Sequence, residues 1–173
     1  LPPHLPLLDW RAPPLEPRSR TLVLYGPHQS PAAADMEARL SEIGLSAVQL
    51  VDYRNFAHGR HYGLARHLAE TLVVALVDPV DANIADATLG ILPKSTNVIR
   101  LETNLAWPAS TLDLLVGSMR LVGTLAAERG DDLDRPGVPR FGRRLYHLST
   151  RRRVSPAVPG AVLRVDEPMD RAE

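Results

Sequence analysis

A carboxylate and an imidazole in one stretch of this chain have the types and spacing to move protons. Glu42 ends a segment with helical spacing, and His58, followed by Gly59, stands in a polar segment after an apolar run. These two side-chain types are common general acids and bases in enzymes. The stretch therefore predicts acid/base chemistry, with the two groups delivered by adjacent elements of one α/β unit.

A helix before Glu42 and a strand before His58 must position this pair. Met36, Leu40 and Ile43 recur at helical spacing, and Gly44 is expected to end the helix. Residues 46–51 are interpreted as a short buried strand, and residues 52–60 as a polar loop.

The same alternation of strand and helix patterns continues along the chain. Further strands are predicted at residues 20–25, 71–77 and 97–101, and further helices at residues 83–92 and 108–129. The apolar run 71–77 suits a central parallel strand covered on both faces. The pattern predicts an α/β fold, a three-layer αβα sandwich of the flavodoxin-like kind with a mainly parallel sheet of four or five strands. The site is expected at the carboxyl ends of the strands.

The loop at residues 26–30 leads from the first strand into the first long helix. Unpaired backbone N–H groups converge where a strand, a tight turn and a helix begin, so anions can bind there. Ser30 in this loop is a substrate-binding candidate. An ordinary connection between strand and helix is the alternative.

Residues 31–61 resemble the sugar isomerase (SIS) domain family, in particular the second SIS module of glucosamine-6-phosphate synthases. That module reads roughly Y-P-x-A-L-E-G-A-L-K-L-K-E-I-S, then a strand, then G-E-x-x-H-G-P. Aligned without gaps, Pro31 meets the family's proline and Glu42 the glutamate that moves the proton. His58 and Gly59 meet the histidine–glycine pair that helps to open the sugar ring. The resemblance implies that Glu42 and His58 are catalytic and that Gly59 contacts the substrate.

Other positions in this stretch depart from the family pattern. Arg39 stands where the family has a lysine, and the resemblance implies that it holds developing negative charge. Asp35 replaces a glutamate, Asn55 replaces the glutamate before the histidine, and Arg60 replaces the proline after the histidine–glycine pair. These departures leave the sugar unidentified.

A second point of resemblance lies in residues 131–148. The synthase family ends its last helix with D-x-D-x-P, which is matched here by Asp132, Asp134 and Pro136. The family's active-site lysine has no lysine counterpart, and the stretch carries Arg140, Arg143 and Arg144 instead. Because a guanidinium holds phosphate or carboxylate in a fork but does not readily lose its proton, Arg140 and Arg143 are interpreted as substrate-binding residues. A basic surface tail is the alternative.

The resemblance implies aldose–ketose isomerisation of a phosphosugar or an amino-sugar phosphate. This reaction moves a proton between C1 and C2 through an enediol and requires neither an organic cofactor nor a metal. Two other functions stay open. The chain could be a non-catalytic SIS domain that binds a phosphosugar and regulates a fused or partner domain, or a structural assembly subunit. Glu42 and His58 favour the enzyme, and the missing lysine favours the regulatory domain.

The resemblance also predicts a partner. Family enzymes carry two SIS modules, the first with a phosphate loop similar to T-S-Q-S-G-E-T, and no segment here matches it. We expect a homodimer or a separate SIS module to complete the site, with His58 acting in a neighbouring subunit. The helix at residues 108–129 has a broad apolar stripe suited to such an interface, made of Leu112, Leu115, Val116, Met119, Val122 and Leu125.

Composition argues against several other functions. The 173 residues include 20 basic and 20 acidic ones, so no net charge draws the chain to nucleic acid or to a membrane surface. The chain has no cysteine, which excludes disulfides and thiolate chemistry. His61 and His67 are wrongly spaced for two ligands on one helix face, so no metal site is expected. No apolar run approaches the roughly 20 residues that span a bilayer, and a cytoplasmic location is the default expectation.

The sequence divides into three predicted parts. Residues 1–18 hold six prolines and form a proline-rich arm or linker, whose apolar side chains are expected to pack on the domain or on a partner. Residues 19–148 form the SIS-like α/β domain. Residues 149–173 form a basic, proline-bearing C-terminal tail. Because the chain begins at Leu1 rather than Met, we expect it to be a processed protein or a piece of a longer one.

Overall fold

The computed structural model describes residues 18–131, 137, 139–145 and 148. Its centre is a four-stranded parallel sheet of order β2-β1-β3-β4, formed by β1 (Arg20–Tyr25), β2 (Ala47–Asp52), β3 (Thr71–Val77) and β4 (Asn97–Glu102). The predicted α/β sandwich with a parallel sheet is confirmed. The central position of β3 is confirmed too, because all seven of its residues are buried.

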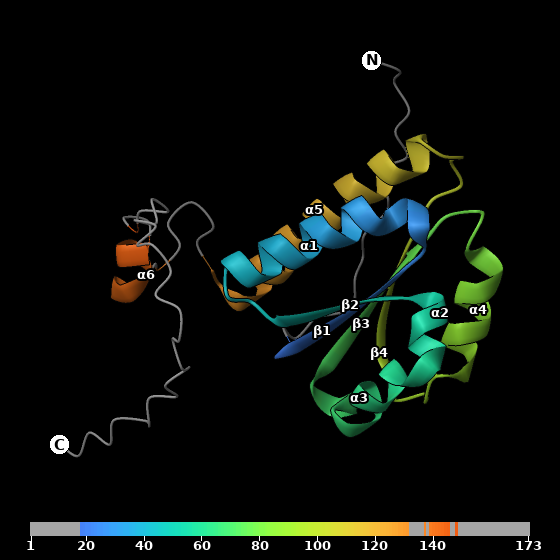
Figure 1. The fold of residues 1–173 in the computed structure, drawn as a ribbon, viewed down its shortest axis with the longest axis horizontal. Coiled ribbons are helices and arrows are strands. Elements are labelled where there is room, and N and C mark those ends of the chain that lie inside the picture. Colours follow the sequence, from blue (N-terminus) through green and yellow to red (C-terminus); the bar gives the residue numbers. More distant parts are fainter. Residues whose placement is uncertain (1–17, 132–136, 138, 146–147, 149–173) are drawn as a thin grey trace, which may run out of the picture. The chain divides into compact units, whose positions relative to one another are not determined.

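Helices cover both faces of the sheet (Figure 1). One face packs against α1 (Ser30–Glu42) and α5 (Ala109–Arg129), which lie side by side. The other face packs against α2 (Tyr53–Asn55), α3 (His61–Arg66) and α4 (Ala82–Ile91). Because successive strand residues point to opposite faces, Val74 and Leu76 enter the first core and Val73, Ala75 and Val77 enter the second.

Short helical turns complete the connections. They are a 3-10 helix at Pro27–Gln29, a π-helical turn at Phe56–Arg60 and a 3-10 helix at Leu68–Glu70. The predicted polar loop at residues 52–60 is therefore wrong, because α2 and the π-helical turn occupy most of it. Tyr53 and Phe56 bury their rings there, which gives the segment an apolar anchor that a free loop would lack.

The strand predicted at residues 46–51 exists, but it is not a buried one. β2 lies at the edge of the sheet, and only Val51 among its residues is fully buried. The helix before it ends as predicted. Gly44 adopts a left-handed conformation with φ of 61°, which glycine tolerates better than other residues.

The long helix α5 is present, and part of its predicted apolar stripe, including Val122 and Leu125, is buried in the core. Its side toward the sheet and α1 includes Leu114, Leu121, Val122 and Leu125. Three members of the predicted stripe are exposed instead: Leu112, Val116 and Met119. Pro108 occupies the N-terminal capping position of α5, and Ser110 lies inside the helix and is buried.

The chain beyond Pro136 forms a separate unit, from Gly137 to the end, which contains α6 (Arg140–Leu145). Residues 1–17 and 149–173, which hold nearly all of the predicted arm and the whole predicted tail, lie outside the described residues. The predicted domain boundaries remain predictions.

Candidate functional site

The predicted acid/base pair is not assembled within one chain. Glu42 is the exposed last residue of α1, on one face of the sheet. His58 lies in the π-helical turn of the segment that covers the other face, and it is exposed as well. The catalytic roles of Glu42 and His58 stay predictions.

Two of the other predicted site residues form contacts with residues close to them in sequence. Arg39 forms an ion pair with Asp35, one turn earlier on α1, with Nε 2.7 Å from Oδ2. This hydrogen bond raises the pKa of the Arg39 guanidinium above its ordinary value. Ser30 is exposed and donates its hydroxyl to the carbonyl of Pro27 at 3.1 Å. Gly59 is exposed and has a φ of 98°, so glycine is needed there for backbone geometry.

The arginines predicted to hold phosphate belong to the separate unit after Pro136. Arg140 begins α6 and is exposed, and Arg143 lies in the same helix. Residues 132–136, with the D-x-D-x-P match, lie outside the described part of the chain. The substrate-binding roles of Arg140 and Arg143 therefore stay predictions.

A polar cluster that sequence reasoning missed lies where β1 and β3 end side by side. The two strands are neighbours, but the connection after β1 crosses one face of the sheet to β2, whereas the connection after β3 crosses the other face to β4. Such a switch point opens a crevice at the carboxyl ends of the strands, where α/β proteins commonly bind ligands. His28, Asp78 and Asp81 meet there.

Asp78 is the buried centre of this cluster, with a side chain only 1% exposed. Its Oδ1 accepts hydrogen bonds from the backbone N–H groups of Val80 and Asp81, at 2.9 and 3.2 Å. Its Oδ2 accepts a hydrogen bond from the Ser110 hydroxyl at 3.4 Å and lies 3.2 Å from Nδ1 of His28. The carboxylate thus forms contacts with the segments that follow β1 and β3 and with α5.

The imidazole of His28 is fixed from several sides and is still about one third exposed. Its ring lies against Trp107, with ring centroids 5.9 Å apart, and its backbone carbonyl accepts a hydrogen bond from the Thr111 hydroxyl at 2.9 Å. Because a carboxylate can only accept, the contact with Asp78 implies that Nδ1 carries the hydrogen, and in the neutral ring Nε2 then keeps its lone pair.

Asp81 lies beside this pair and packs closely on the backbone of Gly26. A Cβ at position 26 would be 1.7 Å from Oδ2 of Asp81, so only glycine fits there. Burial raises the pKa of the Asp81 carboxyl, and the nearby charge of Asp78 adds to the increase. The positive charge of protonated His28 partly offsets that increase in pKa, and the Gln29 side chain adds a smaller offset.

His28 and Asp81 line an open cleft of about 700 Å³, which we call the carboxyl-edge cleft. Its other walls come from the ends of β1 and β2 and the start of α4, and include Tyr25, Asp52, Arg54, Val80 and Asn83. Asp52 caps α2 by accepting from the N–H groups of Arg54 and Asn55, and these bonds lower the pKa of its carboxyl. The cleft therefore offers acceptors, an arginine and an oriented imidazole within a volume suited to a small polar ligand.

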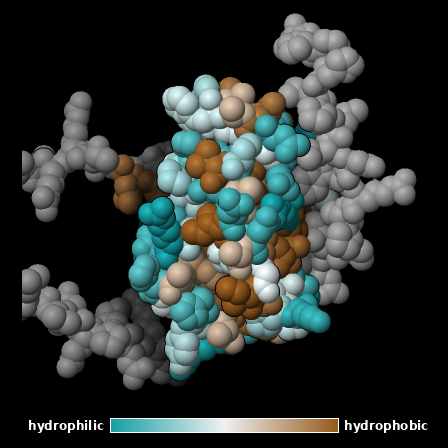
Figure 2. Space-filling view, turned by 90° about the vertical axis from the view of Figure 1, so that its right-hand side faces the viewer, coloured by the Kyte–Doolittle hydropathy of each residue, from teal (hydrophilic) through white to brown (hydrophobic). Residues whose placement is uncertain are grey.

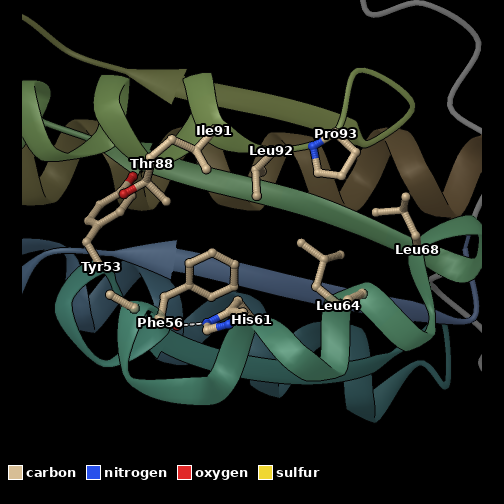
Figure 3. Close-up of a pocket in the computed structure, with 11 residues that line it drawn as sticks. Tyr53, Phe56, His61, Leu64, Leu68, Thr88, Ile91, Leu92 and Pro93 are labelled. Atoms are coloured by element: carbon tan, nitrogen blue, oxygen red, sulfur yellow. Dashed lines mark hydrogen bonds between the residues drawn. The ribbon is translucent and has the colours of Figure 1, made fainter.

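A second hollow is apolar and lies between α3 and α4 (Figure 3). Its volume is about 390 Å³, and its walls include Phe56, Leu64, Leu68, Ile91 and Leu92. His61 enters the wall with Nδ1 3.1 Å from the carbonyl of Phe56. On the side of the molecule that carries α4, Figure 2 shows hydrophobic residues interspersed with hydrophilic ones. This pocket lacks the charged groups that phosphosugar chemistry needs.

The last two observations concern metal binding and membrane spanning. Within the described part of the chain, no group of three or more His, Asp or Glu side chains is arranged to hold a metal ion. No helix in the same part has the length and apolar character needed to cross a membrane.

Comparison with known proteins identifies no family for this chain. No protein-family model matches the chain, and no curated protein matches it. Among solved structures, the chain is similar to a protein from Listeria monocytogenes described provisionally as a sugar-phosphate isomerase. The similarity has a TM-score of 0.47 and 13% sequence identity, and covers 67% of this chain and 73% of the other. A similarity of this size carries no argument about activity.

Proposed function

We propose that this chain is a phosphosugar-binding module of the sugar isomerase type and that its ligand lies in the carboxyl-edge cleft. The observation that carries the proposal is the position of that cleft at the switch point between β1 and β3. The resemblance of residues 31–61 to SIS domains supports a sugar phosphate as the class of ligand.

The lining of the cleft suits a ligand that has both hydroxyl groups and an anionic group. Asp52 and Asp81 are acceptors for sugar hydroxyls, and Arg54 is the arginine of the wall. We place the phosphate at Arg54, because a guanidinium matches phosphate with parallel hydrogen bonds. The phosphate is not placed at the backbone of the β1 loop, because the N–H of Gly26 is already bound to the Gln29 side chain.

Titration calorimetry with fructose 6-phosphate and glucosamine 6-phosphate tests this proposal. Arg54→Gln is expected to weaken binding about 10- to 100-fold, the equivalent of losing a charge-assisted hydrogen bond of about 1.5–3 kcal/mol. Arg60→Gln is the matched control, because Arg60 is exposed and lies outside the cleft lining. Glucose and inorganic phosphate should each bind more weakly than the hexose phosphates. Absence of hexose 6-phosphate binding would refute the proposal.

A second candidate function is an isomerase whose Glu42 and His58 meet across two copies of the chain. It is favoured by the exposure of both side chains and by their location on opposite faces of one sheet. Glu42→Gln and His58→Asn should each abolish isomerisation alone. Refolding the two variants together should restore roughly a quarter of the activity, since half of the dimers are mixed and each holds one intact site. Absence of recovery would exclude the shared site.

A further inference from the structure

We propose that His28, positioned by Asp78, is the proton-transfer group of the carboxyl-edge cleft and acts on a ligand with a carbonyl next to a hydroxyl-bearing carbon. The inference rests on the proposed function for its ligand, a hexose phosphate in the cleft. It requires neither Glu42 nor His58, because the residues involved come from the loops after β1 and β3.

The geometry around His28 is that of an oriented base. Asp78 is buried and accepts hydrogen bonds from two backbone N–H groups and a hydroxyl, so its position is fixed independently of His28. Its contact with Nδ1 sets the tautomer and leaves Nε2 as the free nitrogen of the ring. Trp107 supports the ring, and His28 is among the residues that line the cleft. Asp78 does not line the cleft, so it is a positioning residue.

Asp81 supplies the complementary acid in the same cleft. Its carboxyl retains a proton to higher pH than an exposed carboxyl does, because burial and the charge of Asp78 both raise its pKa. Asp81 is held against Gly26, where no side chain could be accommodated. A base and a carboxyl that holds its proton to higher pH than an exposed carboxyl, together in one cleft, are the two groups that enolisation of a sugar requires.

The reaction balances with these two groups alone. Nε2 of His28 takes the proton from C2 of an aldose, the C–H electron pair forms the C1–C2 double bond, and the carbonyl oxygen takes the proton of Asp81. In the second half, the C2 hydroxyl returns a proton to Asp81 and becomes the carbonyl. The proton on His28 then goes to C1, which gives the ketose. The sugar is isomerised without net oxidation or reduction, so no further reactant is consumed.

The test is the exchange of the C2 hydrogen of an aldose phosphate, glucose 6-phosphate, with D2O in the presence of the full chain, followed by proton NMR. His28→Asn keeps a donor near the Nδ1 position, toward Asp78, and removes Nε2, so it should bind the ligand normally and lose exchange about 100-fold or more. His61→Asn is the matched control, because His61 also uses Nδ1 for a contact, with the Phe56 carbonyl, but lies in the apolar pocket. Exchange by His61→Asn should equal that of the native chain.

Asp78→Asn separates a positioning role from a purely structural one. The amide can donate to Nδ1 and favour the wrong tautomer, so exchange should fall and its pH profile should change while ligand affinity stays within a few-fold. Nitrogen-15 NMR of the native protein should show His28 protonated on Nδ1, and the opposite tautomer would overturn the inference even if His28→Asn fails to fold.

The outcomes distinguish the inference from the proposed function. Binding without exchange by the native chain, or undiminished exchange by a folded His28→Asn variant, overturns the role of His28 and leaves the binding module intact. Failure of the native chain to bind any hexose 6-phosphate overturns both.

Discussion

The polar residues that follow β1 and β3 differ from those that follow β2 in how firmly the fold holds them. After β3, Asp78 is buried and contacts His28 in the 3-10 helix after β1 and Ser110 on α5. After β2, Asp52 is only half-buried, and its partners, Arg54 and Asn55, are its near neighbours in sequence. His28 shares the first arrangement, whereas His58 is exposed in the second region. Polar groups held by distant parts of the chain are better candidates for chemistry, because their orientation survives local fluctuation.

The largest expected difference between the two regions concerns their aspartates. Asp78→Ala would leave donors without an acceptor, including the N–H of Val80 and the buried hydroxyl of Ser110. We expect it to lower the free energy of unfolding by about 2–4 kcal/mol. Asp52→Ala removes a helix cap and should cost about 1 kcal/mol. Urea denaturation of both variants measures the difference, and equal losses would show that the two regions are held alike.

A smaller difference is expected between two glycines, Gly26 and Gly59. Gly26→Ala would place a Cβ 1.7 Å from the Asp81 carboxylate, and moving that carboxylate should cost about 1–3 kcal/mol. Gly59→Ala has open space around the new methyl group but retains a φ of 98°, so it should cost about 1 kcal/mol. Thermal unfolding of the two variants shows which substitution costs more stability. If Gly59→Ala is the more harmful, the close contact between Gly26 and Asp81 is not a constraint on the fold.

The layered fold was accessible from the sequence because the signals that specify it are local. The six apolar residues that follow Thr71 in β3 and the helical spacing of Met36 and Leu40 were sufficient to place a buried strand and a buried helix face. The edge position of β2 was not accessible, since strand order depends on which connections cross the sheet. The sequence also did not separate the core face of α5 from the exposed part of its apolar stripe. Packing against α1 decides that Leu114 and Leu121 are buried while Leu112 and Val116 are exposed.

The cluster around His28 was missed because it is formed by long-range pairing. His28 and Asp78 are 50 residues apart in sequence and meet only because β1 and β3 are neighbours. A signal was nevertheless present, since His28 follows the first predicted strand and Asp78 and Asp81 follow the central one. Carboxyl ends of parallel strands share one edge of the sheet, so polar residues at those ends are worth combining before any strand order is known.

The smallest expected effect concerns the pH dependence of stability, to which Asp81 and Asp52 contribute with opposite signs. The pKa of Asp81 is raised, mainly by burial, so the folded chain binds this proton more tightly than the unfolded chain. The stability it contributes is present at low pH and lost as pH rises from the ordinary aspartate pKa through the folded one. The pKa of Asp52 is lowered, mainly by the hydrogen bond from the N–H of Asn55. Its contribution is present above the ordinary aspartate pKa and is lost as pH falls through the folded value.

Neutral amides should therefore act in opposite directions at these two positions. At pH 7, Asp81→Asn should be slightly more stable than the native chain and Asp52→Asn slightly less. Each difference should stay below about 1 kcal/mol, because solvent screens carboxyls that are partly exposed. Both differences should shrink as pH falls below about 4, where the carboxyls are protonated. Urea denaturation from pH 3 to pH 8 measures this, with Glu37→Gln on α1 as a control away from the cleft. Destabilisation by Asp81→Asn at pH 7 would mean that the charged carboxylate is favoured in the fold, which would remove Asp81 as the acid in the cleft.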